Sequence, residues 1–190
     1  LVPWRDRIRH VARIGVVFQQ PTLDLDLTVR RNLLYFAALH GITHREADVR
    51  TAAVLERLGM AERADELARN LNGGHRRRME IARALIHKPE VLLLDEPTVG
   101  LDAASRGAIT RHVHDLAHDG MTVLWATHLT DEVLPEDQLV ILHHGKVLAD
   151  SVAGQIGSTQ ITDRFLALTD TRPSFAHAAI STEYARESGS

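Results

Sequence analysis

Three apolar stretches along the chain have the length and composition of β-strands. The first, ARIGVVF at 12–18, is rich in β-branched residues. The others, VLLL at 91–94 and MTVLWA at 121–126, are almost unbroken apolar runs. Because such a run is typical of a strand buried on both faces, the pattern predicts parallel strands in the interior of a sheet.

Between these runs, apolar residues recur at helical spacing. Thr43 and Glu46 have the spacing of a capping box, and Asp102 is a candidate N-cap. Glycine or proline follows each helical pattern, which marks where the helix ends. The predicted helices cover about 28–40, 43–59, 76–87 and 102–118, with Gly41, Gly59, Pro89 and Gly120 as their stops.

Two further apolar segments, 139–143 and 146–149, are joined through His144-Gly145 and predict a closing hairpin. Elsewhere strands and helices alternate, which is typical of an α/β sheet with right-handed crossovers. Beyond about Asp150 the sequence turns small and polar except for RFLALT at 164–169, and we expect this end to be weakly ordered.

The composition narrows the possible partners. The 190 residues carry a net charge of −3 with acidic and basic residues interspersed, so no overall field favours nucleic acid or an anionic membrane surface. The absence of cysteine excludes disulfides, thiolate metal sites and cysteine nucleophiles. No apolar run approaches the roughly 18 residues of a membrane-spanning helix, so we expect any span to come from another chain.

Acidic residues follow the run at 91–94, at the edge where open parallel sheets bind ligands. Asp95 ends the run and Glu96 comes next. A carboxylate at the first position suits Mg²⁺, directly or through water, and one at the second can orient or deprotonate an attacking water. The alternative for this segment alone is a strand that ends in solvated acids.

The run at 121–126 brings Thr127 and His128 to the same predicted edge. An imidazole there can contact a terminal phosphate and hold the attacking water in line. A single histidine after a strand is more often an ordinary loop residue, so its interpretation depends on its neighbours.

The stretch LNGGHRRRMEIARAL at 71–85 places two glycines at the start of a helical pattern. A helix N-terminus exposes unpaired N–H groups, and glycine leaves no side chain to block an anion. Gly73 and Gly74 would then face a phosphate, with Asn72 as N-cap or phosphate donor. A Gly-Gly loop before an amphipathic helix is the alternative from these residues alone. The three arginines that follow point in different directions around a helix, so they do not predict a nucleic-acid surface.

Five segments, in their order along the chain, resemble the motifs of ABC transporter ATPase subunits. FQQP at 18–21 is similar to the Q-loop, LNGGH at 71–75 to the signature, VLLLDEP at 91–97 to Walker B, VGLD at 99–102 to the D-loop and THL at 127–129 to the H-loop. The resemblance covers about residues 14–150. It implies an α/β, P-loop NTPase-like fold with a mostly parallel sheet and an inserted α-helical subdomain, about 28–71, that docks on a membrane-spanning partner.

The resemblance also implies a catalytic role for four residues. Gln19 would contact Mg²⁺ or the attacking water and sense the membrane-spanning partner. Asp95 would hold the metal, and Glu96 would be the catalytic base. His128 would be the switch histidine.

A second group of residues would act at the seam between two ATPase subunits. In this family two subunits form a head-to-tail dimer that sandwiches two nucleotides. By resemblance, Asn72, Gly73, Gly74 and His75 would press on the γ-phosphate of ATP held by the opposite subunit. Asp102 would organise the dimer seam.

The same resemblance implies ATP and Mg²⁺ as ligands, a membrane permease as partner, no nucleic acid, and a cytoplasmic position on the inner face of the cell membrane. FQQPTLDLDLTV, LNGGHRRR and WATHL are similar to exporters, in particular to the subset associated with PQQ-dependent alcohol dehydrogenase systems. We therefore expect a partial ABC ATPase domain over 1–150 and a weakly ordered C-terminal extension over 151–190.

The chain departs from the family pattern in two ways. Asn72 and His75 stand where the signature usually has serine and glutamine; asparagine still donates a hydrogen bond, so we expect altered strength rather than loss. The phosphate-binding sequence GxxxxGK[ST] does not occur in the 190 residues. Because the family layout puts it before residue 12, we expect a domain incomplete at its N-terminus, which alone binds ATP poorly and does not turn it over.

Two other functions fit parts of this pattern. A soluble ABC-type ATPase acting in DNA repair or on ribosomes has the same motifs, but it usually carries a coiled-coil insertion or a second ATPase domain, and these 190 residues contain neither. The second is a non-catalytic fragment that binds a partner. Co-purification with a membrane permease separates a transporter subunit from the soluble ATPase.

Overall fold

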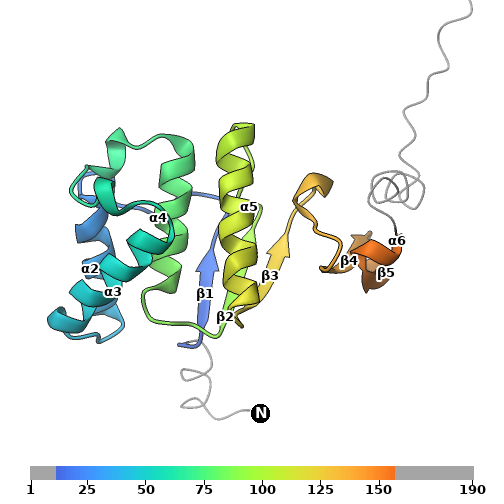
Figure 1. Ribbon diagram of the computed structural model, residues 1–190, viewed down its shortest axis with the longest axis horizontal. Coiled ribbons are helices and arrows are strands. Elements are labelled where there is room, and N and C mark those ends of the chain that lie inside the picture. Colours follow the sequence, from blue (N-terminus) through green and yellow to red (C-terminus); the bar gives the residue numbers. More distant parts are fainter. Residues whose placement is uncertain (1–11, 157–190) are drawn as a thin grey trace, which may run out of the picture. The chain divides into compact units, whose positions relative to one another are not determined.

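The computed structural model describes residues 12–156 (Figure 1). The chain divides into two compact units, with the division between His128 and Leu129. The first unit contains every residue that the sequence predicts for the site, and the second contains the predicted hairpin.

A three-stranded parallel sheet forms the centre of the first unit, in the order β1-β2-β3. Its strands are β1 (Ile14–Val17), β2 (Val91–Asp95) and β3 (Thr122–Ala126), which confirms the three predicted strands. The register places Val17 beside Leu94 and Asp95 beside Ala126. The carboxyl ends of all three strands therefore meet at one edge of the sheet.

Strand β3 is less buried than its sequence predicts. Leu124 is 66% exposed, whereas Leu92 and Leu94 of β2 are buried. Within the described part of this unit β3 is an edge strand, and Val123 and Trp125, which lie on one of its faces, pack against the core. The prediction that this strand is buried on both faces is therefore wrong.

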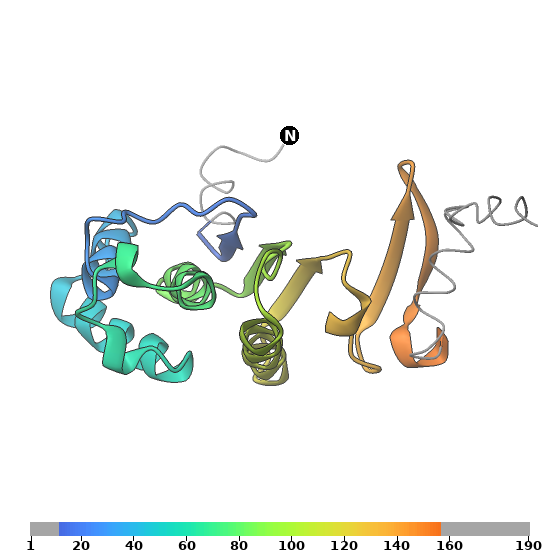
Figure 2. The same cartoon turned by 90° about the horizontal axis from the view of Figure 1, so that it is seen from above.

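Four α-helices accompany the sheet in the described part of the first unit. They are α2 (Val29–Leu39), α3 (His44–Arg57), α4 (Gly73–Leu85) and α5 (Ala103–His118), with 3-10 turns at Ala61–Arg63 and Ala68–Asn70. Helices α4 and α5 pack against the sheet, and α2 and α3 lie together beyond α4, away from β3 (Figure 1 and Figure 2). One core joins these elements, and its fully buried members include Leu33, Leu55, Met79, Ile81 and Leu92. No helix within 12–156 has the length and apolar content needed to cross a membrane.

The apolar spacing predicts a helix from 76, whereas α4 begins at Gly73, and the prediction of Asn72 as its N-cap is confirmed. The side-chain Oδ1 of Asn72 accepts a hydrogen bond from the His75 N–H at 2.8 Å, so Asn72 is the N-cap and Gly73 is the first helical residue. The helix begins three residues early because an asparagine cap satisfies an N–H that would otherwise be unpaired, which outweighs the low helix propensity of two glycines.

The prediction of a capping box at the start of α3 is wrong, because its hydrogen bonds do not form. Thr43 is the N-cap residue, but its side chain accepts no hydrogen bond from the helix. The Glu46 carboxylate pairs instead with Arg50, one turn further along. An ion pair at this spacing competes with the reach back to the cap.

The second unit contains an antiparallel pair, β4 (Gln138–His143) and β5 (Lys146–Val152), between a 3-10 turn at Thr130–Glu132 and a short helix α6 (Ala153–Ile156). His144 and Gly145 have φ of 47° and 73°, the left-handed conformation that a two-residue hairpin turn needs. The predicted hairpin is confirmed. RFLALT and most of the predicted extension lie outside the described residues, and the domain boundary near 150 stays a prediction.

Candidate functional site

Three residues that follow three different strands lie together at the carboxyl edge of the sheet. Gln19 follows β1, Glu96 follows β2 and His128 follows β3. The Gln19 Nε2 donates to Glu96 Oε2 at 3.1 Å, and His128 Nδ1 lies 3.1 Å from Glu96 Oε1. We call Gln19, Glu96 and His128 the carboxylate cluster, because Glu96 contacts one partner with each of its oxygens.

The backbone of Glu96 is held in an unusual conformation. Its φ is 44°, in the left-handed region that a residue with a side chain rarely adopts and that costs about 1–3 kcal/mol. The Glu96 N–H donates to Ala126 O at 2.9 Å, which extends the pairing of β2 and β3 by one residue. The end of β3 therefore fixes the strained residue, while 29% of the Glu96 side chain remains exposed to solvent.

The donors beside the cluster suit a hard divalent cation. Asp95 is the last residue of β2 and is exposed, and Gln19 offers an amide oxygen. Mg²⁺ in proteins usually takes one or two such oxygens and completes its octahedron with phosphate and water. Among residues 12–156, no group of three or more His, Cys, Asp and Glu side chains could hold a metal ion. These residues therefore fit a Mg²⁺ shared with a phosphate substrate better than a site closed by protein ligands.

The two glycines at the start of α4 have different surroundings. A Cβ on Gly74 would lie 2.4 Å from Ser105 Oγ and 2.7 Å from Ser105 Cβ, which no real Cβ tolerates. Gly74 is buried, so its missing side chain allows α4 to approach α5. Gly73 is exposed, and a Cβ there would meet only the end of the Leu101 side chain, at 3.2 Å. Of the two glycines, Gly73 is the exposed one.

His75, in the first turn of α4, is half-buried. Burial lowers the pKa of His75, and the positive charges of Arg78 and Arg63 lower it further. At neutral pH the imidazole is therefore neutral and offers one donor and one acceptor nitrogen.

Asp102 is the N-cap of α5 and hydrogen-bonds Ser105, the residue that lies against Gly74. Its Oδ1 accepts the Ser105 N–H at 2.9 Å, and its Oδ2 accepts the Ser105 hydroxyl at 2.8 Å. These two hydrogen bonds, the backbone one first, lower the pKa of Asp102. Sequence reasoning missed Ser105, although it lies three residues after the cap, where an N-cap finds its usual partner.

A family comparison decides what kind of protein carries this arrangement. The family model described as ABC transporter matches residues 3–99, about half of the chain. The chain belongs to the ABC transporter family.

Two curated relatives agree with this ABC assignment. The linearmycin resistance ATP-binding protein LnrL of Bacillus subtilis (strain 168) is 39% identical over 158 residues, which are 83% of this chain and 51% of the relative. The Nod factor export ATP-binding protein I of Rhizobium meliloti (strain 1021) is 40% identical over 150 residues, 78% of this chain and 44% of the relative. The chain therefore spans about half the length of these curated relatives. Neither is named for PQQ-dependent alcohol dehydrogenase systems, so that narrower resemblance stays a prediction.

A solved structure shares the fold. The structure of cbiO1 from Clostridium perfringens, described as part of the ABC transporter complex cbiONQ, has a TM-score of 0.76 and 27% identity, and the match covers 87% of this chain and 67% of that one. The predicted α/β fold of the P-loop NTPase type is confirmed.

The three consecutive arginines of α4, Arg76, Arg77 and Arg78, contact three different parts of the first unit. Arg76 donates to backbone carbonyls of the 3-10 turn Ala68–Asn70, and Arg78 donates to carbonyls at the C-terminal end of α3. Arg77 donates to the segment that contains Gln19. The prediction that they point in different directions is confirmed, but sequence reasoning missed their partners. The opposite charges of Arg77 and Glu80 at helical spacing were the available signal.

Proposed function

We propose that this chain is part of the ATP-binding and ATP-hydrolysing subunit of an ABC transporter that powers export through a membrane permease. The observation that carries the proposal is the carboxylate cluster, to which three parallel strands contribute an amide, a carboxylate and an imidazole. Such a set is suited to orient and deprotonate a water for in-line attack on a phosphate. The names of the two relatives, which mention resistance and export, support the direction of transport.

In the proposed reaction Glu96 is the general base. It accepts a proton as the water oxygen bonds to the γ-phosphorus and the bond to the β–γ bridging oxygen breaks, which gives ADP and phosphate. Gln19 and His128 hold the two carboxylate oxygens in the free protein, so they fix the rotation of the Glu96 side chain. With substrate bound, His128 also contacts the terminal phosphate.

Asp95 and Gln19 supply the proposed Mg²⁺ ligands. The ion, when bound, neutralises charge that develops on the transferred phosphate. The protein contributes the position of both ligands, because Asp95 ends β2, Gln19 lies two residues after β1, and the register of these strands is fixed.

The start of α4 is the proposed contact to ATP bound by a second subunit in a head-to-tail dimer. Asn72 accepts the His75 N–H through Oδ1, which leaves its side-chain N–H groups for the γ-phosphate. The backbone N–H of Gly73 and the neutral ring of His75 are further donors. Gly74 and Asp102 set the geometry of this surface through Ser105, and Asp102 organises the seam.

The proposed partners follow from the transporter role. The helical region at about 28–71 docks on the permease, and the protein works at the inner, cytoplasmic face of the cell membrane. The 190 residues contain no GxxxxGK[ST], so the chain by itself is expected to bind ATP weakly and not to hydrolyse it. Magnesium-dependent ATP hydrolysis by this chain alone would contradict that expectation.

The test uses the protein encoded by the whole reading frame that contains Leu1 to Ser190. It is expressed with the permease encoded beside it, purified, and assayed for ATP hydrolysis with and without Mg²⁺. We expect Mg²⁺-dependent hydrolysis in a fraction that contains the permease. Hydrolysis without any permease would favour the soluble ATPase, and a protein that neither binds nor hydrolyses ATP would favour the non-catalytic alternative.

A further inference from the structure

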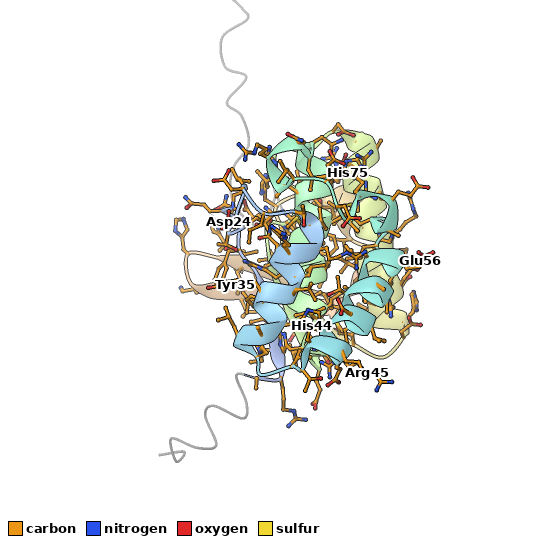
Figure 3. All side chains as sticks on the ribbon, turned by 90° about the vertical axis from the view of Figure 1, so that its left-hand side faces the viewer. Asp24, Tyr35, His44, Arg45, Glu56 and His75 are labelled. Carbon is orange, nitrogen blue, oxygen red and sulfur yellow. The ribbon has the colours of Figure 1, made fainter. Side chains whose placement is uncertain are left out.

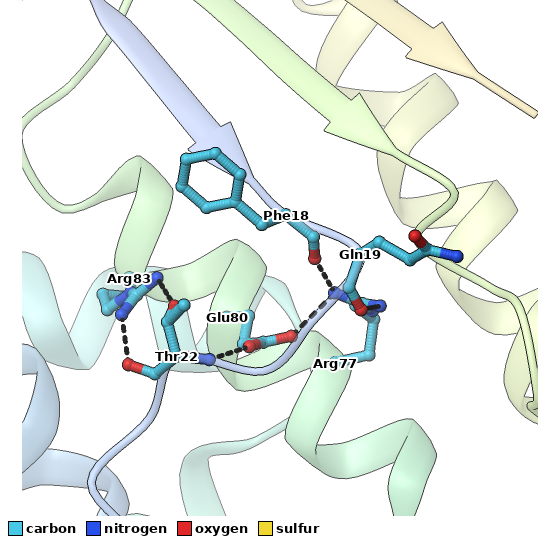
Figure 4. Close-up of polar contacts among 6 residues, drawn as sticks. All are labelled: Phe18, Gln19, Thr22, Arg77, Glu80 and Arg83. Atoms are coloured by element: carbon cyan, nitrogen blue, oxygen red, sulfur yellow. Dashed lines mark hydrogen bonds and ion pairs between the residues drawn. The ribbon is translucent and has the colours of Figure 1, made fainter.

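One face of α4 holds the segment that follows β1. Arg77, Glu80 and Arg83 recur every three residues along the helix, and all three contact the backbone of residues 18–22 (Figure 4). Side chains three apart on a helix share a face, so a single rigid element presents these charges to the loop.

Arg77 binds two successive carbonyls of this loop. Its Nη1 donates to Phe18 O at 2.7 Å, and its Nη2 donates to Gln19 O at 3.0 Å. Nη1 also donates to Glu80 Oε2 at 2.8 Å. The planar fork of arginine satisfies all three acceptors at once, which the single ammonium of a lysine cannot do in the same geometry.

Glu80 completes a ring of hydrogen bonds between the helix and the loop. Its Oε1 accepts the Thr22 N–H at 2.9 Å, while its Oε2 accepts from Arg77. The Arg77 and Glu80 side chains are only 8% and 4% exposed. In this buried pair both carboxylate oxygens and both terminal guanidinium nitrogens have hydrogen-bond partners, and such a pair holds its surroundings in one arrangement.

Arg83 continues the same contact toward helix α2. It donates to Thr22 O at 2.7 Å and to the Thr22 hydroxyl, and its guanidinium lies 5.0 Å from the centre of the Phe36 ring. The loop is therefore attached to α4 at both Gln19 and Thr22.

Gln19 is the residue at which this buried ring meets the candidate site. Its carbonyl is held by Arg77, and its exposed side chain donates to Glu96. An exposed glutamine loses considerable side-chain freedom when it is held in one orientation, so a fixed backbone lowers the cost of its contact with Glu96.

We propose that Arg77 and Glu80 are positioning residues: by holding the backbone at Gln19, they place its side chain against Glu96. The proposal deepens the proposed function and rests on it for the role of Gln19.

Glu80→Gln separates positioning from simple space filling, because the two side chains have nearly the same shape. The carboxylate accepts the Thr22 N–H and the Arg77 N–H on different oxygens, whereas the amide replaces one of these oxygens with an NH2 donor that faces another donor. Arg77→Lys is the second variant. It keeps the positive charge beside Glu80 but removes the fork that holds the Phe18 and Gln19 carbonyls.

The measurement is the pair of side-chain amide NMR signals of Gln19 in the isotope-labelled chain, assigned with Gln19→Ala. Glu96→Ala gives the signal positions without the contact. We expect Glu80→Gln to move the Gln19 signals most of the way toward those positions, and Arg77→Lys to move them in the same direction. A general loss of stability would lower the unfolding midpoint without this directed shift.

Two exposed residues of α3 provide matched controls on the outer side of the helices: Glu56→Gln and Arg45→Lys (Figure 3). Both should leave the Gln19 signals unchanged. Folded Glu80→Gln and Arg77→Lys proteins with wild-type Gln19 signals would overturn the proposal. If Glu80→Gln does not fold, Arg77→Lys decides; if neither folds, the pair is a general stabiliser and the positioning role is wrong.

The readout needs no nucleotide, so it is independent of the proposed function. A protein that shows the Gln19 shift but never hydrolyses ATP would retain the positioning role and refute the ATPase.

Discussion

Glu80 and Glu96 both use two carboxylate oxygens, yet their surroundings are opposite. Glu80 is 3% exposed and lies between Arg77 and the Thr22 N–H. The Glu96 side chain is 29% exposed and lies between Gln19 and His128. Burial makes the first carboxylate a fixed support, because its partners cannot be exchanged for water. Because the Glu96 carboxylate is exposed, it can contact a water molecule and accept a proton. The same chemical group therefore holds a loop in position at Glu80 and is available for reaction at Glu96.

The largest expected effect on stability comes from removal of the buried carboxylate, Glu80. Glu80→Ala leaves the Arg77 guanidinium buried without its counter-charge, so it should lower the free energy of unfolding of the first unit by about 3–5 kcal/mol. Urea denaturation measures the loss. Glu96→Ala should cost far less, and a Glu80→Ala loss no larger than that of Glu96→Ala would show that the buried pair is not a support.

A second contrast of buried and exposed positions lies at the start of α4, between Gly74 and Gly73. Gly74→Ala puts a Cβ against Ser105, so we expect a loss of about 1–3 kcal/mol from overpacking. Gly73→Ala should cost less, because only the mobile end of Leu101 must move. Denaturation of the double variant Gly74→Ala/Ser105→Gly should recover part of the loss. Equal losses at both glycines would contradict the assigned packing.

Glu80 and Asp102 should affect the pH dependence of stability in opposite directions, because the pKa of Glu80 is raised and the pKa of Asp102 is lowered. Burial raises the pKa of Glu80, although the Thr22 N–H and Arg77 oppose the change. The stabilising contribution of Glu80 is therefore fully present below the pKa that this carboxyl has in the unfolded chain. It is lost as pH rises through the pKa of the same carboxyl in the folded protein. Hydrogen bonds from Ser105 lower the pKa of Asp102, so its contribution is present above the unfolded pKa and is lost as pH falls through the folded pKa.

Urea midpoints between about pH 3 and 6 test this opposition, a window set by unfolded pKa values of about 4. The stability advantage of the wild type over Asp102→Asn should shrink as pH falls. Its advantage over Glu80→Gln should grow over the same range. Two differences that change in the same direction would contradict the assigned surroundings.

The smallest expected effect on stability is at the exposed carboxylate. Glu96→Gln keeps the side-chain shape, one acceptor and the exposed position, so the free energy of unfolding should change by no more than about 0.5 kcal/mol. The measurement is again urea denaturation, with Glu56→Gln as the control. A loss of several kcal/mol would make Glu96 a structural residue.

Much of the fold could be predicted because it depends on local patterns. The three strands and the hairpin follow from apolar runs and turn residues, and Asp102 caps α5 as expected. The convergence of Glu96 and His128 could also be predicted, since parallel strands bring their carboxyl ends to one edge, whereas Gln19 is assigned to the site only through the family resemblance.

The errors and omissions concern features that depend on distant partners. The exposure of Leu124 depends on what covers β3, which its own sequence does not record. The spacing of Arg77 and Glu80 indicates an ion pair, but not that it is buried against a loop more than fifty residues away in the chain. The packing role of Gly74 likewise depends on Ser105 of another helix.

The most direct test of the account is ATP turnover and ATP binding by Glu96→Gln in the protein from the whole reading frame, purified with its permease. We predict that binding is retained while turnover falls by about 10²–10⁴, the contribution of a positioned general base. Glu136→Gln, at an exposed position outside both the site and the region at 28–71, should match the wild type in both. Wild-type turnover in Glu96→Gln would contradict the assignment of Glu96 as the catalytic base and of the carboxylate cluster as the hydrolytic site.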